Sequence, residues 1–190
     1  MLFRLFQGLL TTGRTTWSLP KYKSCTILMS RTFIFVGSER YLSIYNGEFE
    51  GYSRFLDLEA SAEDLGQAVV DAILASHNQA NPFPLAGKKA VKSEKIARLR
   101  RYDSWCESVV ERFGFKDRAD LFRPMLYVTI SFNGERASFL PSRQIALDGW
   151  DADPYSQQHE TQLADLEDIA MIGQHTRDAL TKCGTRYSRT

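Results

Sequence analysis

The pattern of apolar and polar positions first predicts a hairpin near the start of the chain. Residues 31–36 (RTFIFV) concentrate β-branched and aromatic side chains, and residues 40–45 (RYLSIY) alternate apolar with other positions, as strands do. A glycine-serine pair at 37–38 is expected to break the run between them. The Asn-Gly pair at 46–47 favours a tight turn, and residues 48–58 follow as a mixed strand or loop.

A second hairpin gives the strongest strand signal in the sequence. Residues 125–132 (MLYVTISF) predict one strand, the Asn-Gly pair at 133–134 predicts the turn, and residues 135–140 (ERASFL) predict the returning strand. Pro141 is expected to end that strand, because proline cannot donate a hydrogen bond to a sheet. Residues 148–161 (DGWDADPYSQQHET) predict a polar loop.

Apolar residues recur at helical spacing in three longer segments. The first, residues 62–76, follows a capping Ser61 and carries acidic residues in its first turn. The second begins at residue 92 or 93 and ends at residue 113, where a glycine follows. A short helix is expected at 117–122, and a last helix covers 166–183.

Strands and helices in this order predict an α+β fold, with a mixed or antiparallel sheet built from two hairpins and helices packed on it. Two helices also resemble each other, with LGQAVVDAI at 65–73 and IGQHTRDAL at 172–180. Glycine inside a helix costs about 1 kcal/mol, so Gly66 and Gly173 predict a close approach of each helix to a sheet or another helix. The similarity reflects either a duplicated ββα unit or a coincidence between amphipathic helices.

Residues 1–28 differ in composition from the rest of the chain. They contain four basic residues and no acidic residue, and their apolar run MLFRLFQGLL is too short to span a bilayer. Their composition is nearer to a mitochondrial presequence than to a secretory signal. We expect a single folded domain over residues 29–184 and a frayed tail at 185–190. Residues 1–28 would then be either a disordered extension or the product of a reading frame whose start was assigned too early. In the second case Met29 is the true start.

Composition and charge narrow the function classes. The chain has 190 residues, of which 43% are hydrophobic and 25% charged, and its net charge is +1. These values fit one globular domain and do not fit a strongly basic nucleic-acid binder. The three cysteines lack any pairing logic, which favours reduced thiols in a cytoplasmic compartment. The three histidines lack metal-ligand spacing, so we expect no metal and no other cofactor.

The sequence offers little that could carry catalysis. No P-loop, dinucleotide-binding loop or nucleophile elbow is present. An acid–base pair could be built from His159 and Glu160 in the polar loop, but an exposed histidine beside a glutamate is more often solvated surface. Cys106, between Trp105 and Glu107 on an apolar helical face, predicts a buried structural thiol. We therefore expect no catalytic residues, and a protein that is not an enzyme.

One interval of the sequence lacks positive charge. Between Gln144 and Thr176 there is no lysine or arginine, whereas acidic residues recur with Trp150 and Tyr155 among them. Acidic charge speeds the encounter with a basic protein, and aromatic side chains anchor it. Alternatively, the later acids serve the N-terminus of the last helix, and Trp150 packs into the core. The candidate binding residues are Asp148, Trp150, Asp151, Asp153, Tyr155, Glu160, Asp165, Glu167 and Asp168.

A basic run of opposite sign lies at 88–101. It contains seven lysine and arginine residues against one acid, Glu94. Basic helices can bind nucleic-acid phosphates, so an RNA-binding protein that uses this helix is the alternative function. The run has no interleaved aromatic residue before Tyr102, and a solvated helix face is the simpler interpretation.

Four segments resemble the immunity proteins of bacterial contact-dependent growth inhibition (CDI) systems. They are GSERYLSIYNGEFEGY at 37–52, WCESVVERFGFKDRADLFRPMLYVTISFNGE at 105–135, LPSRQIALDGW at 140–150 and IGQHTRDALTKC at 172–183. The resemblance covers nearly all of residues 31–183 and none of residues 1–28.

The resemblance implies a small cytoplasmic protein that binds the C-terminal toxin domain of a large secreted effector and protects the cell that makes it. Such toxins are often nucleases, frequently acting on tRNA. The resemblance supplies no catalytic or binding residue, so the acidic interval is the candidate contact, because an acidic surface can occupy a groove that binds phosphate. It implies no direct nucleic-acid partner and no membrane span, and it leaves the oligomeric state open.

Overall fold

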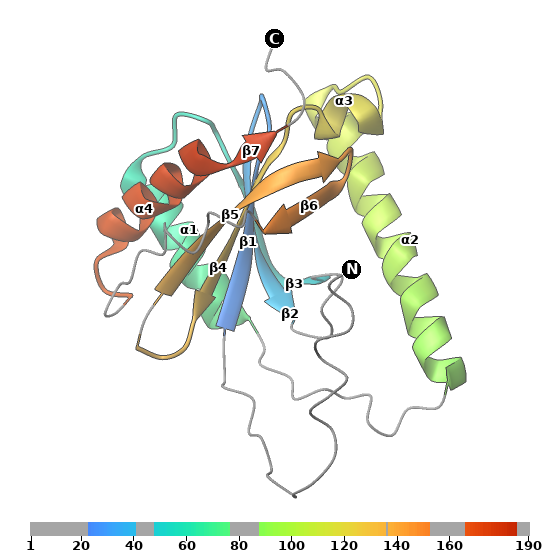
Figure 1. Ribbon diagram of the computed structural model, residues 1–190, viewed down its shortest axis with the longest axis horizontal. Helices are drawn as coiled ribbons and strands as arrows, with labels where there is room; N and C mark the ends of the chain where they lie inside the picture. The colour runs from blue at the N-terminus through green and yellow to red at the C-terminus, as the bar shows by residue number, and fades with distance from the viewer. Residues whose placement is uncertain (1–22, 41–47, 77–87, 136, 153–165, 186–190) are drawn as a thin grey trace, which may run out of the picture.

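The computed structural model describes residues 23–40, 48–76, 88–135, 137–152 and 166–185 of the chain. In this part of the chain seven strands form one sheet and four helices pack against it, which confirms the predicted α+β class (Figure 1). The elements in chain order are β1 (Lys23–Met29), β2 (Ile34–Arg40), β3 (Glu48–Leu56), α1 (Ala62–Ala75), α2 (Lys88–Phe113), α3 (Arg118–Phe122), β4 (Leu126–Phe132), β5 (Ala137–Ala146), β6 (Gly149–Ala152), α4 (Ile169–Lys182) and β7 (Gly184–Thr185).

The two strands at the centre of the sheet come from opposite halves of the chain. The strand order is β3-β2-β1-β4-β5-β6, each neighbouring pair on this path is antiparallel, and β7 pairs parallel with β5. Ile27 of β1 lies opposite Val36 of β2 on one side and Val128 of β4 on the other. β1 is therefore paired along both of its edges.

The prediction that the folded domain begins at Met29 is wrong, because residues 23–28 form most of β1. The five residues in the middle of this strand are buried. The break in charge near Met29 thus does not mark a domain boundary. Residues 1–22, the rest of the predicted extension, lie outside the described residues.

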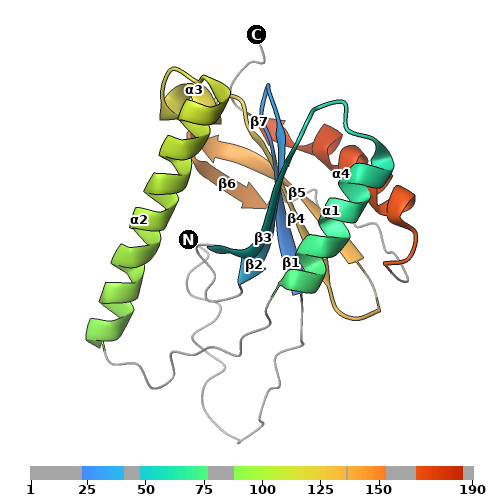
Figure 2. The ribbon, with the colours of Figure 1, turned by 180° about the vertical axis from the view of Figure 1, so that it is seen from behind.

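Each face of the sheet carries its own apolar core (Figures 1 and 2). On the face covered by α1 and α4, Ile27 packs in one buried cluster with Ile73 and Ile172. The opposite face is aromatic and is covered by α2 and α3. There the rings of Phe35 and Trp105 meet at 5.4 Å between centroids. The alternation of side chains along the inner strands supplies both cores.

Two predicted strand boundaries are wrong for reasons that lie in the pairing. β2 continues through Gly37, which lies opposite Thr26 and Ser53, and only the register to β3 shifts there. β5 continues through Pro141, the last residue of β5 that lies opposite β4, and from Ser142 onward β5 pairs with β6. The proline therefore occupies the point where the strand changes partner, so its missing N–H interrupts neither ladder midway.

The other element predictions differ from the structure mainly at their ends. The β4–β5 hairpin is confirmed, and Gly134 in its turn has a φ of +99°, which favours glycine. The helices at 62–76, 117–122 and 166–183 are confirmed within a few residues, and α2 begins earlier than expected, at Lys88. The predicted polar loop at 148–161 contains strand β6. The predicted turn at 46–47 lies outside the described residues.

The two similar helices, α1 and α4, pack directly on each other through their glycines. A Cβ atom on Gly66 would lie 1.8 Å from the carbonyl oxygen of Ile169, and one on Gly173 would lie 1.8 Å from the carbonyl oxygen of Ala62. These distances confirm the predicted close approach and show that it is between helices. The contact is reciprocal, because Ala62 and Ile169 each lie four residues before a glycine.

The strand order has the same reciprocity as the helix contact. β1, β2 and β3 followed by α1 form one half, and β4, β5 and β6 followed by α4 form the other, with β1 and β4 adjacent at the centre. The repeated unit in space is thus βββα, one strand larger than the ββα unit expected from the sequence. That the two halves arose by duplication stays a prediction.

Candidate functional site

Three of the candidate binding residues lie in or beside the short edge strand β6. Trp150 lies opposite Gln144 of β5, and Asp151 lies opposite Arg143. Because successive side chains of a strand point to opposite faces, Trp150 and Asp151 face different ways. Asp148 precedes β6, in the turn from β5, and is exposed.

Trp150 packs inward, as the alternative interpretation of the sequence held. Its Nε1 donates a hydrogen bond to the carbonyl oxygen of Met125 at 3.2 Å. Its ring stacks on Tyr127 at 5.3 Å between centroids and meets the edge of Phe122 at 6.0 Å. The side chain thus fixes β6 on the aromatic core and does not project as an anchor for a partner.

Gln144 holds the base of this hairpin, and sequence reasoning missed it. Its side chain is fully buried, and its Nε2 donates to the carbonyl oxygens of Phe122 and Leu147, each at 2.7 Å. Its Oε1 accepts a hydrogen bond from the Thr185 hydroxyl of β7 at 2.8 Å. One amide therefore connects α3, the β5–β6 turn and β7.

Replacing Gln144 with leucine is expected to destabilise the protein by about 3 kcal/mol, because each buried polar group left without a partner costs about 1–3 kcal/mol. The carbonyl oxygens of Phe122 and Leu147 would lose their donor. The free energy of unfolding from urea denaturation measures the effect. Ile145→Ala is the matched control, since Ile145 is exposed on the same strand and should change that energy by less than about 1 kcal/mol. If Gln144→Leu were as stable as the wild type, the hydrogen bonds of the Gln144 amide would not stabilise the hairpin.

The charges around β6 are mixed. Asp151 is exposed beside Arg143 across the strand pair, and opposite charges in such positions attract. Asp148 acts on Tyr102 of α2: burial raises the pKa of Tyr102 above its ordinary value, and the charges of Cys106 and Asp148 raise it further. The ring of Phe122 lies between Tyr102 and Trp150, at 6.3 and 6.0 Å between centroids, so β6 lies close to the middle of α2.

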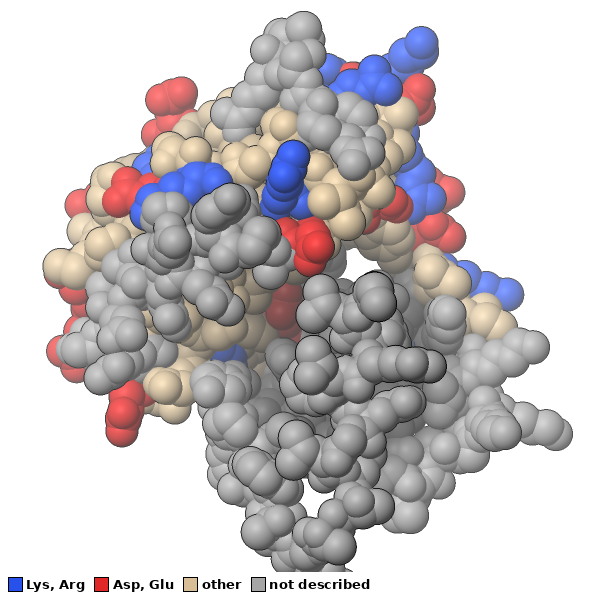
Figure 3. Space-filling view, in the orientation of Figure 1, with Lys and Arg blue, Asp and Glu red and all other residues tan. Residues whose placement is uncertain are grey.

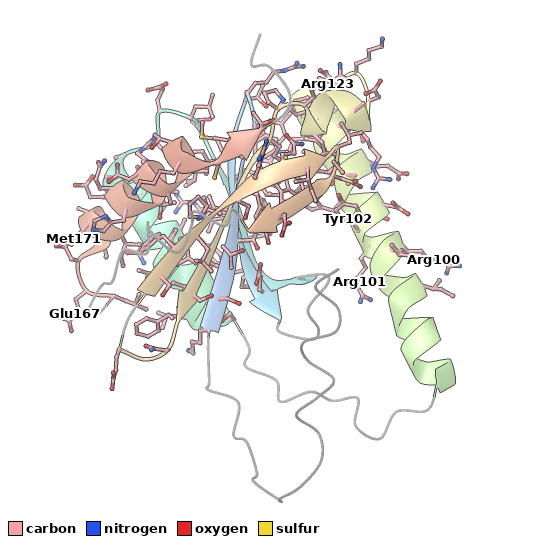
Figure 4. All side chains as sticks on the ribbon, viewed as in Figure 1. Arg100, Arg101, Tyr102, Arg123, Glu167 and Met171 are labelled. Carbon is pink, nitrogen blue, oxygen red and sulfur yellow. The ribbon has the colours of Figure 1, made fainter. Side chains whose placement is uncertain are left out.

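The other described candidates lie elsewhere. Asp168 caps α4, since its Oδ1 accepts a hydrogen bond from the backbone N–H of Met171 at 3.0 Å, as the alternative for the later acids held. Figure 4 shows Glu167 and Met171 at the far end of α4, across the molecule from α2. The structure therefore does not unite the described candidates in one patch. Four further candidates fall outside the described residues: Asp153, Tyr155, Glu160 and Asp165.

Cys106 is buried, which confirms the predicted structural thiol. Arg118, which the sequence did not single out, donates from Nη2 to the Cys106 sulfur at 3.3 Å and from Nη1 to Asp103 at 2.8 Å. Burial raises the pKa of the thiol above its ordinary value, although Arg118 opposes this effect. A buried thiol with a raised pKa is a poor nucleophile at neutral pH.

The described residues also lack two other kinds of site. Within residues 23–185, apart from the segments not described, no three histidine, cysteine, aspartate or glutamate side chains are grouped so that they could hold a metal ion. None of the helices in that part of the chain combines the length and the apolar character that crossing a bilayer requires.

Comparison with known proteins decides the family. The sequence model of CdiI, the CDI immunity protein, matches residues 23–183. The chain belongs to the CdiI family. The match begins at the first residue of β1 and so agrees with the structure in including that strand. No curated protein matches the sequence.

Two solved structures share the fold of this CdiI protein. A protein of unknown function from Neisseria meningitidis is 23% identical, with a TM-score of 0.74 over 88% of this chain and 99% of that one. A CdiA-CT/CdiI toxin and immunity complex from Yersinia pseudotuberculosis contains a chain that is 21% identical, with a TM-score of 0.72 over 86% of this chain and 98% of that one. At these identities the likeness establishes the shared fold.

Proposed function

We propose that this CdiI protein binds the C-terminal toxin domain of a CDI effector and neutralises it in the cytoplasm, by binding and without catalysis of its own. The match to the CdiI family over residues 23–183 carries the proposal. The similar fold in the toxin and immunity complex from Yersinia pseudotuberculosis supports it. The structure adds a folded domain with apolar cores on both faces of its sheet, and a preorganised surface lowers the cost of binding.

We further propose that the toxin is a nuclease, with tRNA as the substrate class. The support is the acidic interval between Gln144 and Thr176, because a nuclease attracts phosphate with a basic groove that an acidic surface can occupy. Of the described acids in this interval, Asp148 in the β5–β6 turn and Asp151 on β6 are exposed and are assigned to the contact. Glu167 is exposed on the other side of the molecule and is assigned no contact.

Co-expression with the toxin domain encoded next to this gene tests neutralisation. The CdiI protein should restore growth of cells that produce this toxin domain, and the two purified proteins should form one complex. An unrelated CDI toxin domain serves as the control and should remain toxic. Equal growth inhibition with and without the CdiI protein would refute neutralisation, whereas protection from a toxin that leaves tRNA intact would refute only the substrate class.

The assignment of Asp148 is tested by charge reversal. Asp148→Lys should slow association with the toxin domain about tenfold at low salt, because long-range attraction sets the association rate of charged partners. Glu167→Lys is the matched control, with the same change of charge on the far side of the molecule. Stopped-flow kinetics at two salt concentrations measures both rates. Equal rates for the two variants would show that Asp148 does not face the toxin.

A further inference from the structure

In the part of the chain that the structure describes, the packing of α2 on the sheet is found in its C-terminal half. The 26 residues of α2 span about 39 Å at 1.5 Å per residue. The C-terminal half packs on the aromatic core through residues such as Tyr102, Cys106 and Val109. Figures 1 and 2 show the N-terminal half extending away from the sheet. We call residues 88–101, this extending half, the α2 arm.

The apolar stripe of α2 does not end where its burial ends. Leu99, Tyr102, Cys106, Val109 and Phe113 follow each other at intervals of three and four residues, which places them on one side of the helix. Four of them belong to the aromatic core. Leu99, the next residue of the same stripe, is 48% exposed. The stripe therefore continues onto the arm as a half-exposed surface.

Ile96 extends this surface. It lies three residues before Leu99, hence on a neighbouring part of the same helix face, and it is 44% exposed. Arg100 is exposed four residues after Ile96, on the same side of the helix, whereas Figure 4 shows Arg101, which is also exposed, projecting from a different side of α2. Ile96 and Leu99 thus form a small apolar surface with Arg100 at its margin, and Arg101 adds positive charge on another side of the same helix turn.

The charge of the arm opposes the stability of its own helix. Seven of its residues are basic and one is acidic, although the N-terminal end of a helix carries positive partial charge and favours acids. The first turn of α2 contains no acid, whereas α1 has Glu63 and Asp64 there and α4 begins with the cap Asp168. Violations of local rules of this kind are expected at functional sites.

The arm ends close to strand β6, because the ring of Tyr102, the next residue, stacks on Phe122 at 6.3 Å and Phe122 meets the ring of Trp150 at 6.0 Å. Asp148 raises the pKa of Tyr102, the residue that follows the arm. The surface thus changes sign along α2, from Asp148 at Tyr102 to Arg100 and Arg101 within a turn. Figure 3 shows described acidic groups both along the margin near α1 and α4 and on the side of α2 and α3.

We propose that the α2 arm is a docking surface for an acidic protein surface of the cognate toxin domain, with Ile96 and Leu99 as the apolar contact, Arg100 as the charge beside them and Arg101 as a second charge that attracts the same acidic surface. The inference rests on the proposed function and extends its contact from the hairpin tip onto α2. The partner is complementary in charge, with an acidic region opposite the arm and a basic region opposite Asp148. Charge complementarity with both signs speeds the encounter and also fixes the orientation of the two proteins.

A protein surface fits the arm better than RNA does. Phosphate contacts account for the arginines and lysines, but they do not account for Ile96 and Leu99, because single-stranded RNA binds through aromatic platforms. The described part of the arm contains no aromatic residue. Exposed aliphatic side chains with a charged rim are typical of protein contacts.

The experiment compares two double variants with a matched control in the full chain. The apolar variant is Ile96→Ser with Leu99→Ser, and the charge variant is Arg100→Glu with Arg101→Glu. The control is Leu74→Ser with Met171→Ser, which removes two large exposed apolar side chains from α1 and α4. Isothermal titration with the toxin domain encoded next to this gene gives Kd, and thermal unfolding shows whether each variant is folded.

The apolar variant should raise Kd about tenfold or more, and the charge variant should do so most strongly at low salt. The control should leave Kd within about twofold. An unchanged Kd for both arm variants, with wild-type binding intact, would overturn the docking surface and leave the proposed function standing. Absence of binding by the wild type would overturn the proposed function itself. Retained toxin binding by the charge variant, together with loss of salt-dependent tRNA binding, would assign the arm to RNA and overturn the proposal.

Discussion

Deletion of residues 1–28 is expected to abolish cooperative folding, although the sequence pattern alone places the start of the domain at Met29. The deletion removes six of the seven residues of β1. β1 is paired with β2 on one side and with β4 on the other. Without it the two halves of the sheet lose the strand that joins them, and β2 and β4 each gain an unpaired edge.

The expected loss of folding free energy supports this prediction. Cys25, Ile27 and Leu28 are buried in the two cores, and full burial of such side chains contributes about 1.5–3 kcal/mol each. The hydrogen bonds of two ladders are lost in addition. A typical domain is stable by only about 5–15 kcal/mol, so the deletion removes an amount comparable to the whole.

Circular dichroism and urea unfolding of the shortened chain measure the outcome, with a chain that lacks only residues 1–22 as the comparison. The shorter deletion keeps β1 and should retain a cooperative transition. A chain beginning at Met29 that unfolds with the wild-type midpoint would contradict the pairing of β1. In the full chain, Ile27→Asp should destabilise by at least about 4 kcal/mol, because it buries an unpaired charge.

Local features of the fold were predictable from the sequence, because the physical causes are local. Ser61 accepts a hydrogen bond from the backbone N–H of Asp64, and Asp117 caps α3 in the same way. Gly134 adopts the positive φ that its turn requires. In each case the interaction that determines the local structure joins residues only a few positions apart in the sequence.

Features that depend on distant pairing were not predictable in this way. The role of β1 depends on β4, about a hundred residues later, and composition near Met29 contains no trace of that contact. Pro141 is tolerated within β5 because the strand changes partner there. Both facts depend on which strands lie next to each other in the sheet. The periodicity of side chains predicts where strands occur but not their order in the sheet.

The candidate site shows the same division. Sequence reasoning located the charged segments correctly along the chain, yet it could not tell that Trp150 faces Tyr127 and Phe122. It also treated residues 88–101 as one uniform basic run. The structure shows that this run is the extending half of a helix whose other half packs on the aromatic core. Ile96 and Leu99 are candidates for binding because they are apolar and exposed on the extending half.

Alanine in place of Gly66 or Gly173 is expected to destabilise the protein by about 3 kcal/mol, at the upper end of the usual cost of overpacking. At an unconstrained helical position the same change stabilises by about 1 kcal/mol, so the sign of the effect is diagnostic. The new Cβ atom would lie 1.8 Å from a backbone carbonyl oxygen of the facing helix in either variant. No side-chain rotation relieves a contact with backbone, so α1 and α4 must move apart.

The double variant provides the sharper test, because the two contacts are reciprocal. Once one alanine has separated the helices, the second meets less resistance, and the combined loss should be clearly smaller than the sum of the single losses. Ser104→Ala on the exposed side of α2 is the control and should change the free energy of unfolding by less than about 0.5 kcal/mol. Urea denaturation of all four variants gives the free energies of unfolding for this double-mutant cycle and its control. Strict additivity, or a gain in stability from either glycine change, would show that the two glycines do not meet as the structure describes.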